Sequence, residues 1–151
     1  MTVTSLRAQG NVEDSRWETA VRCIKKFEGW HGPEHHPYVA YGHRIRKGEK
    51  FPVRLTESEG DSILRKDLKE MCALFRHLGK DSLLVACLAY QVGPYKLFGY
   101  GRMPKSTLIR KLEAGNRNIY VDFIRYCHYK GKKISSIERR RKEEYRLLFV
   151  P

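Results

Sequence analysis

The stretch FEGWHGPEHHPYVAYGH, residues 27–43, decides the fold. It begins at the end of an apolar pattern with helical spacing, and Gly29, directly after Glu28, predicts the end of that helix. Closely spaced glycines and prolines then separate short β-prone pieces such as YVAYGH, which predicts a small hairpin. Because the stretch also holds two glutamates and four histidines, three interpretations are open: a metal site, a surface loop or part of an active site.

Helical patterns dominate the sequence on both sides of this hairpin. Capping boxes at residues 15–18 and 56–59 predict two helix starts, because each pairs a Ser or Thr with a glutamate three residues later. The most apolar segment, residues 81–93, predicts a central core helix that ends at a Gly-Pro pair. Amphipathic patterns predict further helices over residues 106–115, 119–129 and 135–149.

This order predicts a single domain of the α+β class, mostly helical, over residues 14–151. We expect a small β hairpin lobe to face a helical lobe across a cleft, and residues 1–13 to form a flexible lead-in. A length of 151 residues, with 41% hydrophobic and 31% charged residues, fits one globular domain with a real core.

The chain is strongly basic. It has 30 Lys and Arg against 17 Asp and Glu, a formal net charge of +13, which favours polyanionic partners such as nucleic acid, anionic membranes or the bacterial wall. No apolar stretch approaches the roughly 18 residues of a membrane helix, and the first residues lack the apolar core of a signal peptide. The protein is expected either to be cytoplasmic until released or to use an export signal outside this sequence.

The four cysteines are Cys23, Cys72, Cys87 and Cys127, with no C-x-x-C pair, so a structural zinc site is not expected. The first three lie in apolar helical patterns and are interpreted as small buried hydrophobic residues. Disulfide formation is left open.

Taken in order, five motifs resemble those of the phage-type lysozymes, the endolysin family of glycoside hydrolases. They are FEG at 27–29, YVAYGH at 38–43, LAYQVG at 88–93, STLIRKLEAGN at 106–116 and GKKISSIERRRKEE at 131–144. The resemblance covers about residues 16–149. It implies a lysozyme-like fold and a bacteriolytic muramidase, which hydrolyses the β-1,4 bond between N-acetylmuramic acid and N-acetylglucosamine in peptidoglycan.

By this resemblance, Glu28 is the general acid that protonates the leaving oxygen. The role makes chemical sense, because a glycosidic leaving group needs an acid that stays protonated near neutral pH, and so a partly desolvated carboxyl group. The carbonyl groups at a helix C-terminus also disfavour a negative charge there. The alternative is an ordinary, solvent-facing glutamate at the end of a helix.

The second catalytic group departs from the family pattern, Glu-x8-Asp-x5-Thr. Neither counting forward from Glu28 nor counting back from the Gly-His pair reaches an aspartate, and the loop is shorter than usual. Glu34 is the only carboxylate in this loop and is therefore the candidate base. Tyr38, His43 and His36 are further candidates for holding the attacking water.

Sugar-binding clefts are lined by polar and aromatic side chains. We expect substrate contacts from His36, Tyr38, Tyr41, Gln91 and Tyr95. Gln91 stands where the family often has asparagine. Simple packing is the alternative for Tyr41 and Tyr95.

Metal binding is a rival interpretation of the same loop. His31, His35, His36 and His43 together with Glu34 offer enough ligands for zinc. However, His35 and His36 are adjacent and no H-E-x-x-H spacing occurs, so we expect neither a metal nor another cofactor.

Two other functions remain open. A nucleic-acid-binding helical domain would fit the net charge and the tyrosine-rich YCHYKGKK at 126–133, although no nucleic-acid-binding motif stands out. An inactive, lysozyme-like wall-binding protein would fit the missing aspartate. The preferred prediction is a monomeric enzyme acting on peptidoglycan at the cell wall, with no nucleic-acid partner and no integral membrane segment.

Overall fold

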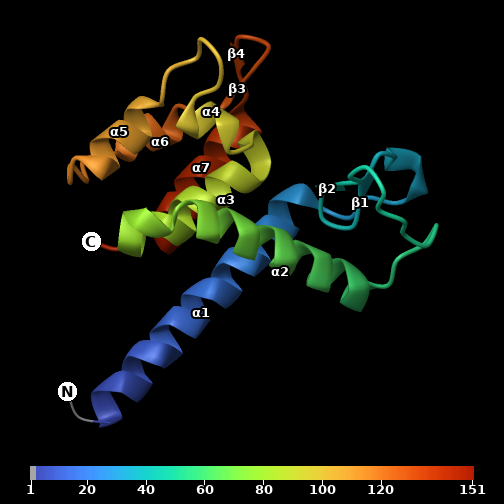
Figure 1. The fold of residues 1–151 in the computed structure, drawn as a ribbon, viewed down its shortest axis with the longest axis horizontal. Helices are drawn as coiled ribbons and strands as arrows, with labels where there is room; N and C mark the ends of the chain where they lie inside the picture. The colour runs from blue at the N-terminus through green and yellow to red at the C-terminus, as the bar shows by residue number, and fades with distance from the viewer. Residues whose placement is uncertain (1–2) are drawn as a thin grey trace. The chain divides into compact units, whose positions relative to one another are not determined.

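The computed structural model describes the backbone of residues 3–151 and the side chains from residue 14 onward (Figure 1). The chain divides into two compact units, residues 1–70 and 71–151. Helices with small antiparallel hairpins make up the described part, which confirms the predicted α+β, mostly helical class. None of the described helices combines the length and the apolarity that crossing a membrane requires.

The first unit opens with a long helix, α1 (Val3–Glu28). The predicted start at Ser15 is wrong, because Ser15 lies inside this helix and its carbonyl accepts a hydrogen bond from Oγ1 of Thr19 at 2.8 Å. Residues 1 and 2, and the side chains up to residue 13, lie outside the described part of the chain. The flexible lead-in therefore stays a prediction.

After α1 the chain forms the predicted hairpin. A short 3₁₀ turn, η1 (Pro33–His35), leads into β1 (Tyr38–Val39), which pairs antiparallel with β2 (His43–Arg44). Val39 lies opposite His43 in this register. The helix end and the hairpin thus follow the glycine and proline pattern that predicted them.

The hairpin is followed by α2 (Glu57–Leu74), which begins where the second capping box predicts. The backbone N–H of Glu59 donates to Oγ1 of Thr56 at 3.1 Å, and that of Thr56 donates to Oε1 of Glu59 at 3.0 Å. The backbone N–H groups of Thr56 and Glu59 are therefore both satisfied by neighbouring residues. This is why the sequence alone locates the start of α2.

Ion pairs join α1 to α2 within the first unit. Arg65 lies 2.7 Å from a carboxylate oxygen of Glu18 and 2.7 Å from one of Asp61. Lys25 lies 2.6 Å from Asp61 and 2.8 Å from Glu57. Because these groups are only partly buried, a single pair contributes little to stability, and the stabilisation comes from the connected network.

The second unit is built around α3 (Ser82–Val92), the predicted core helix. Residues 84–89 are all buried, and Gly93 ends the helix with a left-handed φ of +86°. The other elements of this unit are η2 (Arg76–Asp81), α4 (Tyr95–Phe98), α5 (Thr107–Glu113), α6 (Tyr120–Ile124), β3 (His128–Tyr129), β4 (Lys132–Lys133) and α7 (Ser135–Leu148), and α3 packs against η2 and α7.

One predicted helix of this unit is shorter than expected. The helical pattern over residues 119–129 yields only α6, and the chain then forms the β3–β4 hairpin. Lys130 and Gly131 both have positive φ, 49° and 77°, as a two-residue hairpin turn requires. This turn, rather than helical periodicity, sets the local structure of the tyrosine-rich segment.

The final helix, α7, forms over the predicted stretch. Arg140 and Arg141 of its basic run are buried beside Glu144, whereas Arg139 and Lys142 are exposed. Part of the run is therefore structural, and part adds to the charged surface.

The four cysteines are free thiols. Cys23 and Cys87 are buried as predicted, while Cys72 is half-buried. Burial raises the pKa of the Cys72 thiol to about 11, so this thiol stays protonated at neutral pH.

Candidate functional site

Glu28 is the last residue of α1 and is half-buried. Gly29 ends the helix with φ +67°, and its N–H donates to the carbonyl of Lys25 at 3.1 Å. The turn of the hairpin covers the Glu28 carboxylate: a Cβ at position 42 would lie 3.0 Å from Oε2 of Glu28. Gly42 has φ +92°, so glycine is required here by both backbone conformation and space.

A buried alanine occupies the turn of the hairpin. The N–H of Gly42 donates to the carbonyl of Val39 at 3.1 Å, and Ala40 between them has φ +54° and no exposed surface. The N–H of His31 donates to the carbonyl of Ala40 at 2.7 Å, and Nδ1 of His31 lies 3.2 Å from the same oxygen. His31 therefore fastens the chain after α1 to the hairpin turn.

His43 is buried between two carboxylates. Its Nδ1 lies 2.6 Å from Oδ2 of Asp67 on α2, and its Nε2 lies 2.9 Å from Oε1 of Glu49. Hydrogen bonding by His43 lowers the pKa of Glu49, whereas burial raises the pKa of Asp67 despite its bond to His43. With both ring nitrogens engaged, this geometry favours a role in anchoring the hairpin to α2, and the water-holding role of His43 stays a prediction.

Glu34 is exposed and lies on η1. Its side chain turns back over Gly32, where a Cβ would lie 2.7 Å from Oε2, and Oε1 is 3.3 Å from Nδ1 of His35. Glu34 also lines a pocket of about 370 Å³ in the first unit. The lining of this pocket is Trp30, His31, Gly32, Pro33, Glu34, Val39, Val53, Arg54 and Leu55. Glu28 is not part of that lining.

Trp30 forms an aromatic wall of the same pocket and is 42% exposed. Its ring packs edge-on against Tyr41, with centroids 5.2 Å apart, and lies so close to α2 that a Cβ at Gly60 would be 2.4 Å from Cζ3. The sequence interpretation did not include Trp30 as a site residue. A tryptophan in a polar, Gly-Pro-rich loop was the available signal.

Tyr41 is held by packing and by the ion-pair network of the first unit. Its hydroxyl donates to Oε1 of Glu57 at 3.1 Å, and Nζ of Lys25 lies 5.2 Å from the ring centroid. Burial and the bond to Glu57 raise the pKa of Tyr41. Tyr38 and His36, in contrast, are exposed.

Two predicted substrate contacts lie in the second unit. Gln91, near the end of α3, is exposed, and its Oε1 accepts a hydrogen bond from Nη2 of the fully buried Arg141. Tyr95 is the first residue of α4 and is 67% exposed, with its ring 5.7 Å from that of Tyr100. Arg141 was not foreseen as the partner of Gln91, because fifty residues separate them.

Within the described part of the chain, no group of three or more His, Cys, Asp or Glu is arranged to hold a metal ion. The histidines of the loop have different surroundings, although the rings of His31 and His35 pack edge-on with centroids 5.2 Å apart. His31 contacts the hairpin backbone, His43 is enclosed by carboxylates, and His35 and His36 are exposed.

Comparison with known proteins fits this geometry. A family model described as phage lysozyme matches residues 25–144. Among solved structures, the muramidase domain of SpmX from Asticaccaulis excentricus is similar, with a TM-score of 0.67 at 20% identity, over 88% of this chain and 96% of that chain. No curated protein matches the chain.

The structural likeness supports the predicted lysozyme-like fold, and the family match supplies the relationship. The family match spans most of the sequence, from the end of α1 through the hairpin and the core helix to α7. The chain belongs to the phage lysozyme family.

Proposed function

We propose that this protein hydrolyses the β-1,4 bond between N-acetylmuramic acid and N-acetylglucosamine, with Glu28 as the general acid. Membership of the phage lysozyme family gives degradation of the bacterial wall as the class of activity. The observation that supports Glu28 is its position: a half-buried carboxyl group at a helix C-terminus, covered by the backbone of Gly42. This partly enclosed place at the end of α1, within the family's FEG motif, is the setting expected of a general acid.

Glu34 remains our candidate for the base. It is an exposed carboxylate on a short turn only a few residues beyond the general acid, and no aspartate stands at the family's usual position. Its place beside Trp30 supports contact with a sugar, because an indole face packs well against the apolar face of a pyranose ring. We include Trp30 and Arg54 of this pocket among the substrate-binding candidates, with His36, Tyr38, Tyr41, Gln91 and Tyr95.

A wall-binding protein without lytic activity is the second candidate. The observation that favours it is the missing aspartate, together with the separate setting of Glu34, whose pocket lining excludes Glu28. In that case the protein would bind peptidoglycan and leave the glycan uncut.

The deciding experiment measures clearing of purified peptidoglycan and identifies the new reducing ends. The wild-type protein should release N-acetylmuramic acid at the reducing end. Glu28→Gln should lower the rate by at least about a hundredfold while leaving the fold intact, because it removes the proton donor. Glu113→Gln, which makes the same change at an exposed glutamate at the end of α5, is the matched control and should keep the wild-type rate.

Glu34→Gln tests the base separately. If Glu34 positions the attacking water, turnover should fall strongly while binding to insoluble peptidoglycan is kept. A wild-type rate would exclude Glu34 as the base and shift attention to Tyr38. Binding without any release of reducing ends by the wild-type protein would establish the non-lytic alternative.

A further inference from the structure

One stretch of the second unit is basic and contains no acidic residue. Residues 82–112 contain no Asp or Glu but five basic residues, among them Lys96, Arg102 and Lys105. A one-signed stretch of this length attracts anionic partners. It includes the loop between α4 and α5, residues 99–106.

That loop presents apolar side chains to solvent on a tight turn. Tyr100 and Met103 exchange two backbone hydrogen bonds, at 3.0 and 2.9 Å, and Gly101 between them has φ +57°. Tyr100 is 74% exposed and Met103 is 53% exposed. Arg102 shares the turn and is also exposed. The turn is therefore fixed by its own backbone while its large side chains lie in water.

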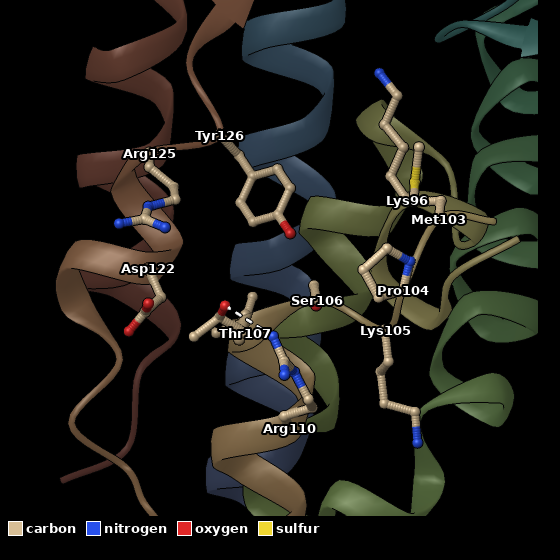
Figure 2. Close-up of a pocket in the computed structure, with 11 residues that line it drawn as sticks. Lys96, Met103, Pro104, Lys105, Ser106, Thr107, Arg110, Asp122, Arg125 and Tyr126 are labelled. Atoms are coloured by element: carbon tan, nitrogen blue, oxygen red, sulfur yellow. Dashed lines mark hydrogen bonds between the residues drawn. The ribbon is translucent and has the colours of Figure 1, made fainter.

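Beside the turn is a pocket of about 270 Å³, drawn in Figure 2. Its lining comes from α4, from the loop and α5, and from α6 and the residues after it: Lys96, Met103, Pro104, Lys105, Ser106, Thr107, Leu108, Arg110, Asp122, Arg125 and Tyr126. Figure 2 shows the hydroxyl of Tyr126 pointing toward Ser106. Three hydroxyl-bearing residues and four basic residues thus contribute to the lining of this pocket.

The cations of this pocket are not neutralised from within. The only carboxylate in the lining, Asp122, is buried and pairs with Nζ of Lys111 at 2.7 Å. Lys105 pairs with Glu113 at 2.7 Å. Lys96, Arg110 and Arg125 have no carboxylate partner in the part of the chain that the structure describes.

Three cations without a carboxylate partner, of which Arg110 donates to the hydroxyl of Thr107 at 3.4 Å, match a phosphate group, whose oxygens accept several hydrogen bonds at once. The exposed side chains of the neighbouring Tyr100 and Met103 indicate which kind of phosphate-bearing partner fits this surface. Tyrosine favours the membrane–water interface, and the flexible apolar side chain of methionine can enter the acyl region. A nucleic acid would instead use the aromatic rings as stacking platforms, but the ring of Tyr100 is tilted 56° against that of Tyr95.

We propose that the turn 100–103 and the pocket beside it form a docking surface for an anionic phospholipid membrane. One headgroup phosphate occupies the pocket between Arg110 and Arg125. Tyr100 and Met103 lie in the interfacial layer. The proposal concerns attachment to a membrane and does not depend on which residue performs glycoside hydrolysis.

The test is co-sedimentation of the full chain with vesicles of phosphatidylglycerol, compared with vesicles of phosphatidylcholine. The wild-type protein should bind the anionic vesicles selectively. Arg110→Gln/Arg125→Gln should weaken binding by roughly tenfold or more, since each basic residue near an anionic surface contributes severalfold. The matched control, Lys132→Gln/Arg139→Gln, removes two exposed cations outside the pocket and should weaken binding by much less.

A second double variant, Tyr100→Ser/Met103→Ser, keeps the charge and tests the apolar contact. It should also weaken vesicle binding, while affinity for soluble glycerol phosphate, followed by NMR at Tyr126, should be unchanged. Equal losses in the pocket variant and the charge-matched control would overturn the proposal. Unchanged vesicle binding by Tyr100→Ser/Met103→Ser would also overturn it. So would competition in which DNA of arbitrary sequence displaces the vesicles equally from the wild-type protein and from the pocket variant.

Discussion

Oε2 of Glu28 lies 3.0 Å from the place that a Cβ would take on Gly42, so the hairpin backbone and the candidate acid share one small space. The glycine allows the turn to pass over the carboxylate. A side chain there would have to displace the group on which the proposed chemistry depends.

Gly42→Ala should therefore abolish most of the lytic activity while lowering the free energy of unfolding only modestly. Placing alanine at φ +92° should cost about 1–2 kcal/mol of unfolding free energy, because L-residues avoid this region. Gly48→Ala is the matched control, since Gly48 also has positive φ, +85°, but no atom within 4 Å of its Cβ position. Thermal unfolding and peptidoglycan clearing should show similar destabilisation in both variants but loss of lysis only in Gly42→Ala. Similar lytic rates in the two would contradict a special role for this contact.

Gly60→Ala should destabilise the protein, contrary to the usual effect of replacing a helical glycine. Replacing glycine by alanine in a helix interior ordinarily raises the free energy of unfolding by about 0.5–1 kcal/mol. Here the new methyl group would fall 2.4 Å from Cζ3 of Trp30, so the indole ring must move. A lower midpoint of thermal unfolding and a shift in tryptophan fluorescence are expected. Ser62→Ala on the same helix should change neither, and a more stable Gly60→Ala would show that Trp30 moves freely.

The stability of the protein should fall in acid because of the network between α1 and α2. Hydrogen bonds from Arg65 lower the pKa of Glu18, and those from Lys25 lower the pKa of Glu57. Burial acts to raise the pKa of Asp61, but hydrogen bonds from Lys25 and Arg65 leave it lowered. A carboxylate with a lowered folded-state pKa contributes stability above its ordinary value and loses it as the pH falls through the folded-state value.

The thermal midpoint should thus decline as the pH falls below 4.5, the ordinary value for the two glutamates. Arg65→Gln should make this decline shallower, because the same carboxylates then titrate closer to their ordinary pKa. Arg44→Gln, an exposed arginine on β2, serves as the control and should keep the wild-type slope. Identical slopes in all three proteins would mean that the ion-pair network between α1 and α2 does not cause the loss of stability in acid.

Arg141→Met should be among the most destabilising single changes in the second unit. Arg141 is fully buried, and burial lowers its pKa, yet its contact with Glu144 balances a carboxylate that is itself buried. Removing one partner of an isolated buried pair typically costs about 3–5 kcal/mol, but Glu144 keeps its bond from Nε of Arg140 at 3.1 Å, so the loss here should lie toward the lower end of that range. Urea unfolding should show this loss, and Arg139→Met on the exposed face should stay within about 0.5 kcal/mol of wild type. The double variant Arg141→Met/Glu144→Leu should be less destabilised than the two single changes added together, and strict additivity would argue against coupling.

Local signals in the sequence predicted much of the fold. Thr56 and Glu59 cap α2 through bonds between neighbours, so their spacing was sufficient to locate the helix start. The same spacing at Ser15 and Glu18 misled, because Glu18 instead pairs with Arg65 on another helix and α1 continues through the site.

The candidate site was predictable in part. The position of Glu28 at a helix end follows from a local pattern, whereas the surroundings of His43 do not. Asp67 and Glu49 lie 24 and 6 residues from His43 with no periodic relation to it, so only the folded chain brings these groups together. Trp30 gains its setting from the absence of a side chain at Gly60, a contact that neither residue signals alone.

The bond between Arg141 and Gln91 gives the exposed amide a fixed polarity. A free glutamine offers both a donor and an acceptor, but here the carbonyl oxygen is already occupied by the guanidinium group, and the amide N–H₂ is the end left for a ligand. A ligand group that accepts a hydrogen bond, such as the carbonyl oxygen of an acetamido substituent, would therefore find a free donor at Gln91, whereas a donor such as its N–H would have to share the carbonyl oxygen with Arg141. The exposed amide of Gln91 is thus oriented from the interior, by the hydrogen bond from the fully buried Arg141.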